Sequence, residues 1–237
     1  ISYKFKKISV GATETAILNC CLSDIEVKLK NIAIEPEIID LINFLNKSGA
    51  NIKFIAKRSL LIKGVKSLNG AKYSIMPDRI EAGTYMIASG ITQSSLTLNN
   101  ILIDHLKNII IVLKKIGFKF KFISNNSLKI LPSKLKPTKI KTVPYPGFPT
   151  DMQAQLMSLL ILTKGNSEIK EDIFENRFLH VLELQRMGAN IQINNNVAKI
   201  TGIDKLSGAE VMATDLRASV CLVLAGLVAR GKTVINR

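Results

Sequence analysis

Four short polar clusters stand where the sequence predicts that helices begin: residues 7–13, 77–81, 149–153 and 213–217. Their Ser, Thr and Asp residues are preferred N-caps, and a cap contributes about 1 kcal/mol to helix stability. Two clusters also place an arginine, Arg79 or Arg217, in the first helical turn, where the helix dipole disfavours positive charge. An anion bound to the free N–H groups of that turn would reverse the penalty. Besides simple capping, the pattern therefore predicts that anionic ligands bind at helix starts.

A carboxylate, Asp151, lies in the third cluster, after a stiff approach. Residues 144–149 contain three prolines, and such a segment loses little conformational entropy when it fixes a side chain. Glu175, Asn176 and Arg177 form another compact polar cluster before a predicted helix. If the fold brings these helix starts to one end of the molecule, acid and guanidinium groups meet there. Such a group would bind an anionic substrate, and its carboxylate could serve as a base.

The remaining reactive side chains indicate no second chemistry. His105 lies in a Leu/Ile-rich helical pattern and is expected to be structural, whereas His180 could support a site, pack or face solvent. Cys20, Cys21 and Cys221 are odd in number, lack metal-ligand spacing and lie in apolar helical patterns. They predict buried, reduced thiols and hence a cytoplasmic protein. We find no glycine-rich phosphate loop, zinc ligand set or nucleophilic triad in the sequence.

The sequence repeats itself at intervals of about 70 residues. Three segments share one pattern, a Leu-rich helix end, a glycine and an alternating strand, and their glycines are Gly49, Gly117 and Gly188. Residues 64–71 similarly match residues 202–209, two repeats later. Such self-similarity indicates a fold built from copies of one supersecondary unit.

Each repeat is expected to contain a helix, a strand, a second helix and further strands. A sheet with helices on one side is the natural packing for this order, and several repeats could share one helical core. The prediction is thus an α/β fold. In the first repeat the helices are expected at Ala12 to Leu22 and from Pro36 to Gly49, and the extended segments at Val27 to Ile34, Asn51 to Ile55, Leu60 to Ile62 and Ala71 to Ile75.

The repeats do not fill the chain evenly. Three are complete, and a fourth begins near Ala209 and stops at Arg237, while the chain opens with Ile1 rather than Met. We expect an internal piece of a longer protein. Pro77 is the expected crossing between a first domain, residues 1–77, and a second, residues 78–237.

The composition is that of a basic globular protein. The chain has 237 residues, 33 Lys+Arg against 18 Asp+Glu, a formal net charge of +15 and 47% hydrophobic residues, which excludes intrinsic disorder. Residues 107–141 hold ten lysines and no acid, a pattern that would suit a nucleic-acid surface. The favoured alternative is lysine on solvent faces, because arginine is scarce there and Phe118, Phe120 and Phe122 alternate with lysine as in a half-buried strand. No apolar run is long enough to cross a bilayer, so we expect no membrane partner.

Several long motifs together resemble the family of UDP-N-acetylglucosamine 1-carboxyvinyltransferases. The similarity is carried by the segments Pro77 to Glu81, Phe148 to Gln155, Phe174 to Phe178, Leu206 to Ala209 and Ala213 to Ser219. It covers essentially the whole chain, and the motifs are collinear. The resemblance implies a two-domain inside-out α/β barrel with helices inside, three repeats per domain and a substrate cleft between the domains. Residues 1–77 would be the last repeat of the domain that carries a catalytic loop.

The resemblance also implies an activity. The family transfers the enolpyruvyl group of phosphoenolpyruvate to the 3-hydroxyl of UDP-N-acetylglucosamine in the first committed step of peptidoglycan synthesis. It implies these two small-molecule substrates, no cofactor, no metal, no nucleic-acid partner and a monomer. Two alternatives stay open: the shikimate-pathway enolpyruvyl transferase, which lacks the Asp151 and Arg177 motifs in this form, and a basic nucleic-acid-binding repeat protein.

Site roles follow residue by residue from the same resemblance. Asp151 matches the carboxylate that contacts the sugar hydroxyl and serves as base or proton acceptor. Arg217 matches a guanidinium that holds phosphoenolpyruvate or phosphate, and Arg177 and Asp215 match polar groups that steady the closed cleft. The positions that match the nucleotide-binding segments are Lys7, Ile8, Ser9, Val10, Gly11 and Ile173.

The chain also departs from the family pattern. The family's loop acid, usually a cysteine, and an early lysine–asparagine pair would lie before residue 1, and a further arginine would lie beyond Arg237. None of the three cysteines matches that acid, so we expect the chain alone to bind nucleotide weakly and catalyse nothing measurable. Tyr145 stands where many relatives have histidine.

Overall fold

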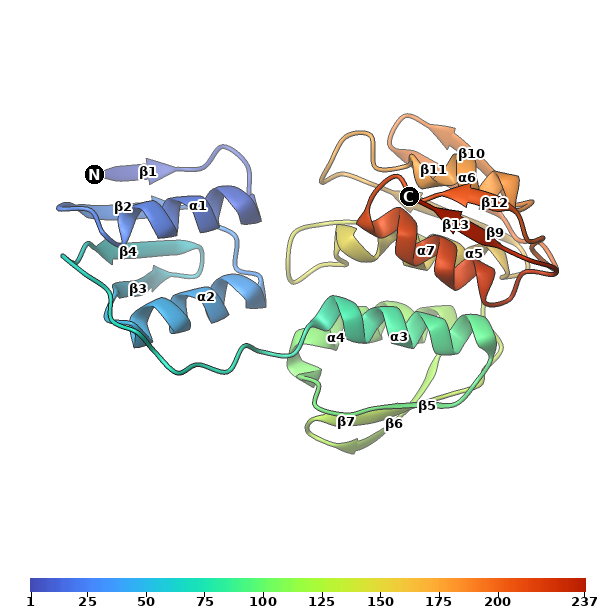
Figure 1. The fold of residues 1–237 in the computed structure, drawn as a ribbon, viewed down its shortest axis with the longest axis horizontal. Coiled ribbons are helices and arrows are strands. Elements are labelled where there is room, and N and C mark those ends of the chain that lie inside the picture. The colour runs from blue at the N-terminus through green and yellow to red at the C-terminus, as the bar shows by residue number, and fades with distance from the viewer. The chain divides into compact units, whose positions relative to one another are not determined.

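The chain divides into two compact bodies, Ile1–Met76 (unit 1) and Pro77–Arg237 (unit 2). The computed structural model describes residues 1–217 and 219–237 in full, and residue 218 only by its place in a helix. Figure 1 shows helices and strands alternating along both units.

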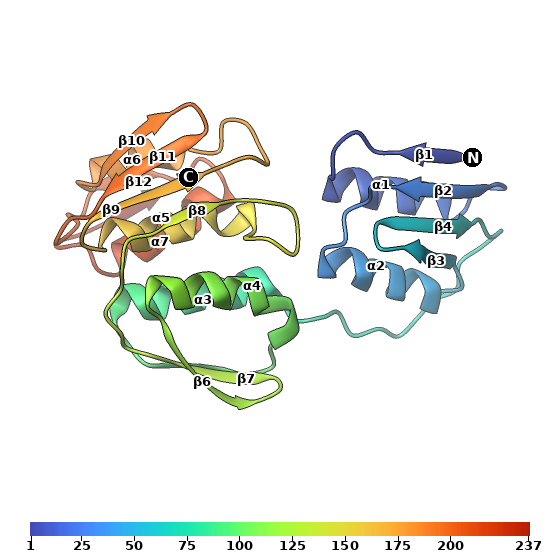
Figure 2. The same ribbon diagram turned by 180° about the vertical axis from the view of Figure 1, so that it is seen from behind.

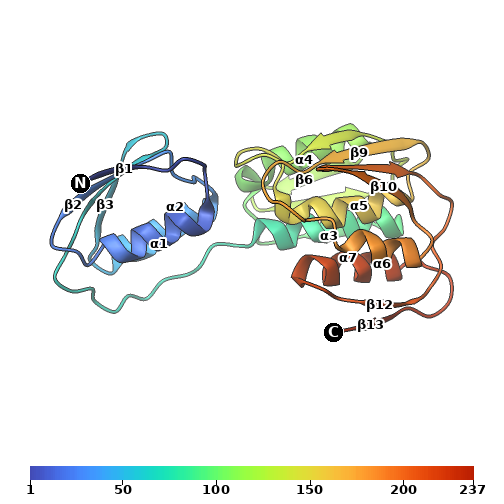
Figure 3. The same cartoon turned by 90° about the horizontal axis from the view of Figure 1, so that it is seen from above.

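Unit 1 is one repeat, a four-stranded sheet with two helices on one face. Its elements are β1 (Ser2–Lys4), α1 (Val10–Cys20), β2 (Glu26–Lys30), α2 (Pro36–Lys47), β3 (Asn51–Ala56) and β4 (Ser59–Lys63). The strand order is β1-β2-β4-β3, with β1 parallel to β2 and the other pairs antiparallel. Both helices lie against the same side of the sheet (Figure 3), where Ile17 of α1 and Ile38 of α2 join the strands in one core.

Unit 2 contains two more full repeats and a shorter third segment. Its sheets have the orders β5-β7-β6, β8-β9-β11-β10 and β12-β13. Strands β8 and β12 pair in parallel with the strand that follows the next α-helix, as β1 does in unit 1. The elements are α3 (Arg79–Thr92), β5 (Leu96–Leu98), α4 (Ile103–Ile116), β6 (Lys119–Ser124), β7 (Ser127–Leu131), β8 (Lys139–Lys141), the 3₁₀ turn η1 (Thr150–Met152), α5 (Gln153–Ile161), β9 (Asn166–Lys170), α6 (His180–Arg186), β10 (Asn190–Asn194), β11 (Val197–Thr201), β12 (Glu210–Met212), α7 (Leu216–Gly226) and β13 (Val234–Asn236).

The repeat glycines explain how these elements are joined. Gly49, Gly117 and Gly188 have φ angles of 102°, 114° and 94°, the left-handed conformation that glycine adopts without steric cost. Each follows a helix end and turns the chain into a strand, as the sequence predicted. The structure thus confirms that the three segments are copies of one local fold.

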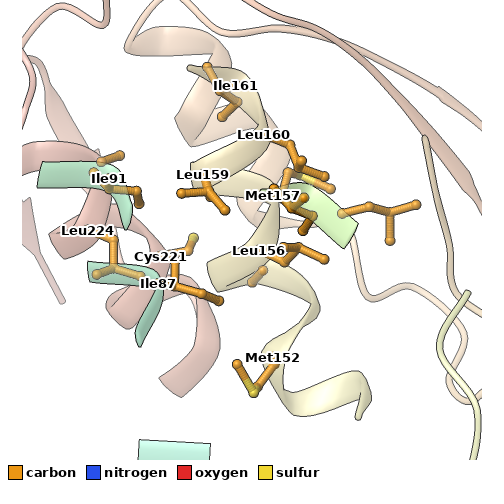
Figure 4. Close-up of a cluster of buried hydrophobic side chains, with 14 of the residues drawn as sticks. Ile87, Ile91, Met152, Leu156, Met157, Leu159, Leu160, Ile161, Cys221 and Leu224 are labelled. Carbon is orange, nitrogen blue, oxygen red and sulfur yellow. The ribbon is translucent and has the colours of Figure 1, made fainter. Parts of the chain in front are cut away.

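The core of unit 2 is helical, with the sheets outside it (Figures 2 and 3). Every residue of α5 is buried, so this helix has no solvent face. Leu156 and Leu159 lie among Ile87 of α3 and Cys221 and Leu224 of α7 in the cluster shown in Figure 4. This arrangement confirms the predicted α/β fold with helices inside.

Other segments of unit 2 approach α3 closely at two of its glycines. A Cβ atom built on Gly90 would lie 2.3 Å from Cζ of Phe118, and one on Gly83 would lie 2.4 Å from the sulfur of Met152. Met152 is the residue after Asp151. The missing side chain at Gly83 therefore leaves the space in which η1 packs against α3.

Two expectations from the sequence are wrong. Residues 64–78 contain no strand, although one was expected at Ala71 to Ile75. The matching segment two repeats later forms β12 because β13 pairs with it, whereas residues 71–75 pair with no strand and Tyr73 instead donates to a carboxylate oxygen of Asp40 at 2.7 Å. The half-buried strand expected at Phe118, Phe120 and Phe122 would place all three rings on its buried face, but Phe122 is 47% exposed and Lys114 Nζ lies 5.3 Å from its ring centroid.

The described part of the chain holds no helix that is both long and apolar enough to cross a membrane.

Candidate functional site

Asp151 lies between two arginines on the surface of unit 2. Its Oδ1 accepts a hydrogen bond from Nε of Arg217 at 3.0 Å and faces Nη1 of Arg177 at 3.3 Å. The Asp151 side chain is 44% exposed, so a ligand could reach it from solvent. The structure therefore brings together the acid and the two guanidinium groups that the sequence singled out. We call Asp151, Arg177 and Arg217 the acid–arginine cluster.

The backbone before Asp151 is held by bonds within its own loop. Val143 N–H donates to Phe148 O, and Gly147 N–H donates to Pro144 O. The side-chain amide of Asn108, in α4, donates to Pro146 O. Phe148 is buried, which anchors the end of the loop immediately before η1. The loop before Asp151 is thus held in place by its own contacts, as its proline content predicted.

Arg177 is held on three sides. Its Nη1 donates to the Thr150 hydroxyl at 2.6 Å, and its guanidinium carbon lies 4.3 Å from the centroid of the Phe174 ring. The side chain is only 11% exposed. Burial, and then the nearby charge of Arg217, lower the pKa of Arg177, while Asp151 and Glu171 oppose that shift. An arginine in such surroundings still carries its charge at neutral pH, because its ordinary pKa is far above 7.

Arg217 is the second residue of α7, at the positive end of the helix dipole. The carboxylate of Asp215 accepts its backbone N–H at 2.7 Å. Asp215 thus provides this contact at the helix start. The bond from Arg217 to Asp151 uses Nε, so the two terminal nitrogens, the fork that binds carboxylate or phosphate, take no part in it. With its side chain 37% exposed, Arg217 is placed to bind an anion.

The residues expected to bind nucleotide lie in two places. Ile173 belongs to the loop between β9 and α6, four positions before Arg177, and is half-buried. The others, Lys7 to Gly11, form the start of α1 in unit 1. Ser9 is its N-cap and accepts Ala12 N–H at 3.3 Å, while Gly11 is exposed with no atom within 4 Å of a built Cβ. That helix start is open to a ligand.

His180 and the cysteines stay outside this chemistry. His180 is 2% exposed, and burial lowers its pKa to about 4 although the charge of Asp215 acts in the opposite direction. The ring is therefore packed in the interior and does not face solvent. Burial raises the pKa of Cys221 to about 12 and also raises that of Cys20, so neither thiol is an activated nucleophile. Cys20 is half-exposed, which corrects the expectation that all three thiols are buried.

Two residues of this region were not singled out from the sequence, Glu171 and its partner Thr150. Glu171, 2% exposed, accepts the Thr150 hydroxyl at 2.8 Å and the backbone N–H groups of Ile173 and Phe174 at 2.8 Å and 3.2 Å. The only signal in the sequence is the position of Glu171, directly after a predicted strand and shortly before the Phe174 motif. No group of three or more potential metal-binding side chains occurs within the described residues.

Comparison with known proteins places this geometry in context. The sequence model of a family described as EPSP synthase (3-phosphoshikimate 1-carboxyvinyltransferase) matches residues 1–237. The chain is 55% identical to a UDP-N-acetylglucosamine 1-carboxyvinyltransferase of Pelagibacter ubique over 234 residues, which cover 99% of this chain and 56% of that relative. A protein of the same name from Orientia tsutsugamushi strain Ikeda is 55% identical over 238 residues, again 56% of its length. The chain thus spans about half the length of these relatives.

Solved structures show the same fold. The enolpyruvyl transferase NikO from Streptomyces tendae superposes with a TM-score of 0.85 and 25% identity over 96% of this chain and 55% of its own. An EPSP synthase from Acinetobacter baumannii superposes with a TM-score of 0.69 over 100% of this chain and 58% of its own. At 16% identity, the second likeness concerns the fold alone.

Proposed function

We propose, from the premise that this chain belongs to the EPSP synthase (3-phosphoshikimate 1-carboxyvinyltransferase) family, that it is part of an enzyme transferring the enolpyruvyl group of phosphoenolpyruvate to UDP-N-acetylglucosamine. The choice of acceptor rests on the relatives at 55% identity, which are named for that sugar nucleotide. The shikimate-pathway alternative has weaker support, since the EPSP synthase structure shares only 16% identity.

The observation that carries the proposal is the contact of Asp151 with two guanidinium groups. In the proposed reaction the 3-hydroxyl oxygen of the sugar bonds to C2 of phosphoenolpyruvate while C3 gains a proton. The tetrahedral intermediate then loses phosphate from C2 and a proton from C3, which restores the double bond. The partly exposed carboxylate of Asp151 would accept the hydroxyl proton, a role that needs a base within hydrogen-bond reach of the acceptor sugar.

The two arginines would have different roles: Arg217 would bind the anionic second substrate, and Arg177 would hold Asp151. Phosphoenolpyruvate and the released phosphate are anions, and the terminal nitrogens of Arg217 take no part in its bond to Asp151. Arg177 would hold Asp151 in place, and Asp215 would fix the start of α7. Lys7, Ile8, Ser9, Val10 and Gly11 would bind the diphosphate at the start of α1, with Ile173 near the uracil.

The wider setting belongs to the same proposal. Unit 1 would be the last repeat of a domain that carries the catalytic loop, and unit 2 would belong to the second domain. The whole protein would act as a cytoplasmic monomer in peptidoglycan synthesis, and so in cell shape and division. Its loop acid would come from sequence beyond these 237 residues.

A two-substrate assay tests the proposal. In the complete gene product, phosphate release should require both phosphoenolpyruvate and UDP-N-acetylglucosamine. Release with shikimate 3-phosphate instead would favour the shikimate alternative, and salt-sensitive retention on DNA without release would favour nucleic-acid binding.

Replacing Asp151 by asparagine tests whether this carboxylate is the base. Asp151→Asn should lower kcat by about 10²- to 10⁴-fold, the usual contribution of a general base. Asp204→Asn is the matched control, since Asp204 is an exposed aspartate 3.6 Å from Lys164. Near-normal turnover of Asp151→Asn would refute the assignment of the base.

A further inference from the structure

We infer that Glu171 is a positioning residue for Asp151, acting through Thr150 and Arg177. The inference deepens the proposed function and rests on it for the catalytic consequence, while the geometric consequence can be tested alone. It starts from the chain of contacts Glu171–Thr150–Arg177–Asp151.

Glu171 joins two segments that lie far apart in the sequence. Its Oε2 accepts the hydroxyl of Thr150, in η1, at 2.8 Å. Its Oε1 accepts the N–H groups of Ile173 and Phe174, in the loop that carries Arg177, at 2.8 Å and 3.2 Å. One carboxylate therefore fastens the turn that holds Asp151 to the loop that holds its arginine partner.

The position of Glu171 is itself fixed. It directly follows β9, and its backbone N–H donates to Asn196 O at 2.8 Å. The residue is 2% exposed, so its charge is compensated by the three protein donors rather than by bulk water. A buried carboxylate with this many donors is a rigid anchor.

The charge of Glu171 also sets the direction of the next hydrogen bond. An ionised carboxylate can only accept, so the hydroxyl proton of Thr150 must point toward Oε2. The lone pairs of Thr150 Oγ1 then face the other way, where Arg177 Nη1 donates at 2.6 Å. The same nitrogen of Arg177 faces Asp151 Oδ1 at 3.3 Å. Glu171 thereby determines where the guanidinium sits beside the base.

An amide at this position would reverse the direction. Gln could keep its oxygen on the two backbone N–H groups, but its nitrogen would then donate to Thr150 Oγ1. The buried hydroxyl proton of Thr150 would then have lost its acceptor. It would have to point to another side of Oγ1, where it would interfere with the hydrogen bond that Arg177 donates to this oxygen. Arg177 should then shift away from Thr150 and Asp151, although the side chain at 171 has nearly its original size.

The geometric test uses crystal structures of the 237-residue chain with Glu171→Gln. We expect the Arg177–Asp151 contact to break while the Arg217–Asp151 bond remains, since the latter does not involve Thr150. Glu168→Gln is the matched control, because Glu168 lies in the same strand, 4.0 Å from Lys139. An unchanged position of Arg177 in Glu171→Gln would overturn the inference.

The kinetic test uses the complete gene product. Glu171→Gln should lower kcat by about 10- to 100-fold, because small displacements of a base are costly, and should change the KM for UDP-N-acetylglucosamine by less than about threefold. A larger change in KM than in kcat, or the same kcat as Glu168→Gln, would overturn the inference. If the wild-type enzyme releases no phosphate from these substrates, the proposed function fails, and the crystal structures still decide the role of Glu171.

Variants of Thr150 separate positioning from stability. Thr150→Val removes the hydroxyl with little change in shape, and Thr150→Ser restores it, so Val should reproduce the loss in kcat and Ser should recover most of it. If Glu171 acts through Thr150, adding Glu171→Gln to the Thr150→Val background should cost little more. Full additivity of the two losses would overturn the inference. Because Thr150→Val tests the same link, the test stands even if Glu171→Gln fails to fold.

Discussion

Replacing Arg217 by lysine should weaken phosphoenolpyruvate binding selectively. Arg217 bonds to Asp151 through Nε, which leaves both terminal nitrogens for an anion. Lysine has one nitrogen, so a lysine at this position could contact Asp151 or the substrate but not both in this geometry. The change keeps the positive charge but replaces the three guanidinium nitrogens by one.

The size of the effect follows from the hydrogen bond to the substrate that lysine cannot make. One charge-assisted hydrogen bond contributes about 1.5–3 kcal/mol, which corresponds to an increase of about 10- to 150-fold in the KM for phosphoenolpyruvate. The effect on stability should be small. Arg217 and Asp151 are 37% and 44% exposed, and such partly exposed pairs contribute within about 1 kcal/mol to the free energy of unfolding.

Initial rates of the complete gene product, with each substrate varied in turn, measure this selectivity. Arg186→Lys is the control, because Arg186 is a surface arginine 3.8 Å from Glu183 in α6 and outside the acid–arginine cluster. An equal rise in the KM values for phosphoenolpyruvate and UDP-N-acetylglucosamine would refute the reasoning. So would a loss of several kcal/mol in the free energy of unfolding, since the defect would then be structural.

Three further predictions concern packing, the nucleotide and pH. Gly90→Ala should lower the free energy of unfolding by about 1–3 kcal/mol, because the new Cβ would lie 2.3 Å from Phe118 Cζ. Urea denaturation should show no such loss for the control Gly70→Ala, because no atom lies within 4 Å of a Cβ built there. Gly11→Ala should leave the free energy of unfolding unchanged or raise it by up to about 1 kcal/mol. If the diphosphate binds at the start of α1, the same change should increase the KM for UDP-N-acetylglucosamine, and an unchanged KM would exclude binding there. The folded-state pKa of His180, about 4, lies below its ordinary 6.5. The contribution of the neutral ring to the free energy of unfolding is therefore complete above pH 6.5, and about 3 kcal/mol of that free energy is lost as the pH falls toward 4. Urea denaturation of His180→Asn should therefore show a weaker loss of stability between pH 7 and pH 4 than the wild type, and an identical loss would contradict the argument.

Local features of the fold could be predicted because the chain specifies them over a few residues. Gly49, Gly117 and Gly188 were recognised as copies of one helix end, and each has the left-handed φ that such an end requires. Pro36 was expected at a helix start and is the first residue of α2. In these cases backbone sterics decide the outcome, and backbone sterics depend on residue type alone.

Features that depend on distant partners were harder to predict. Residues 71–75 have a strand-like sequence but form no strand, because strand formation needs a neighbouring strand to pair with. Phe122 follows the alternation of a half-buried strand and would lie on its buried face, yet the sheet leaves it 47% exposed. Alternation shows which side chains share a face but not how much of that face is covered.

The candidate site also contains both kinds of feature, those set by local sequence and those set by distant partners. The types of Asp151 and Arg217 at helix starts predicted that they would meet, and they do, 66 positions apart in the sequence. The contact of Glu171 with Thr150 depends on how the end of β9 lies beside η1, which no local pattern reports. Residue types could therefore indicate that Asp151 and Arg217 meet, while the contact of Glu171 with Thr150 could be found only from the coordinates.

The bond between Asp151 and Arg217 has a consequence for how such a protein could have arisen. Its carboxylate belongs to one copy of the repeated segment and its guanidinium to the copy that follows. The bond cannot form within one copy of the segment, because its two groups stand in different copies. A protein built from this repeat could thus have gained the pairing only once two copies lay side by side.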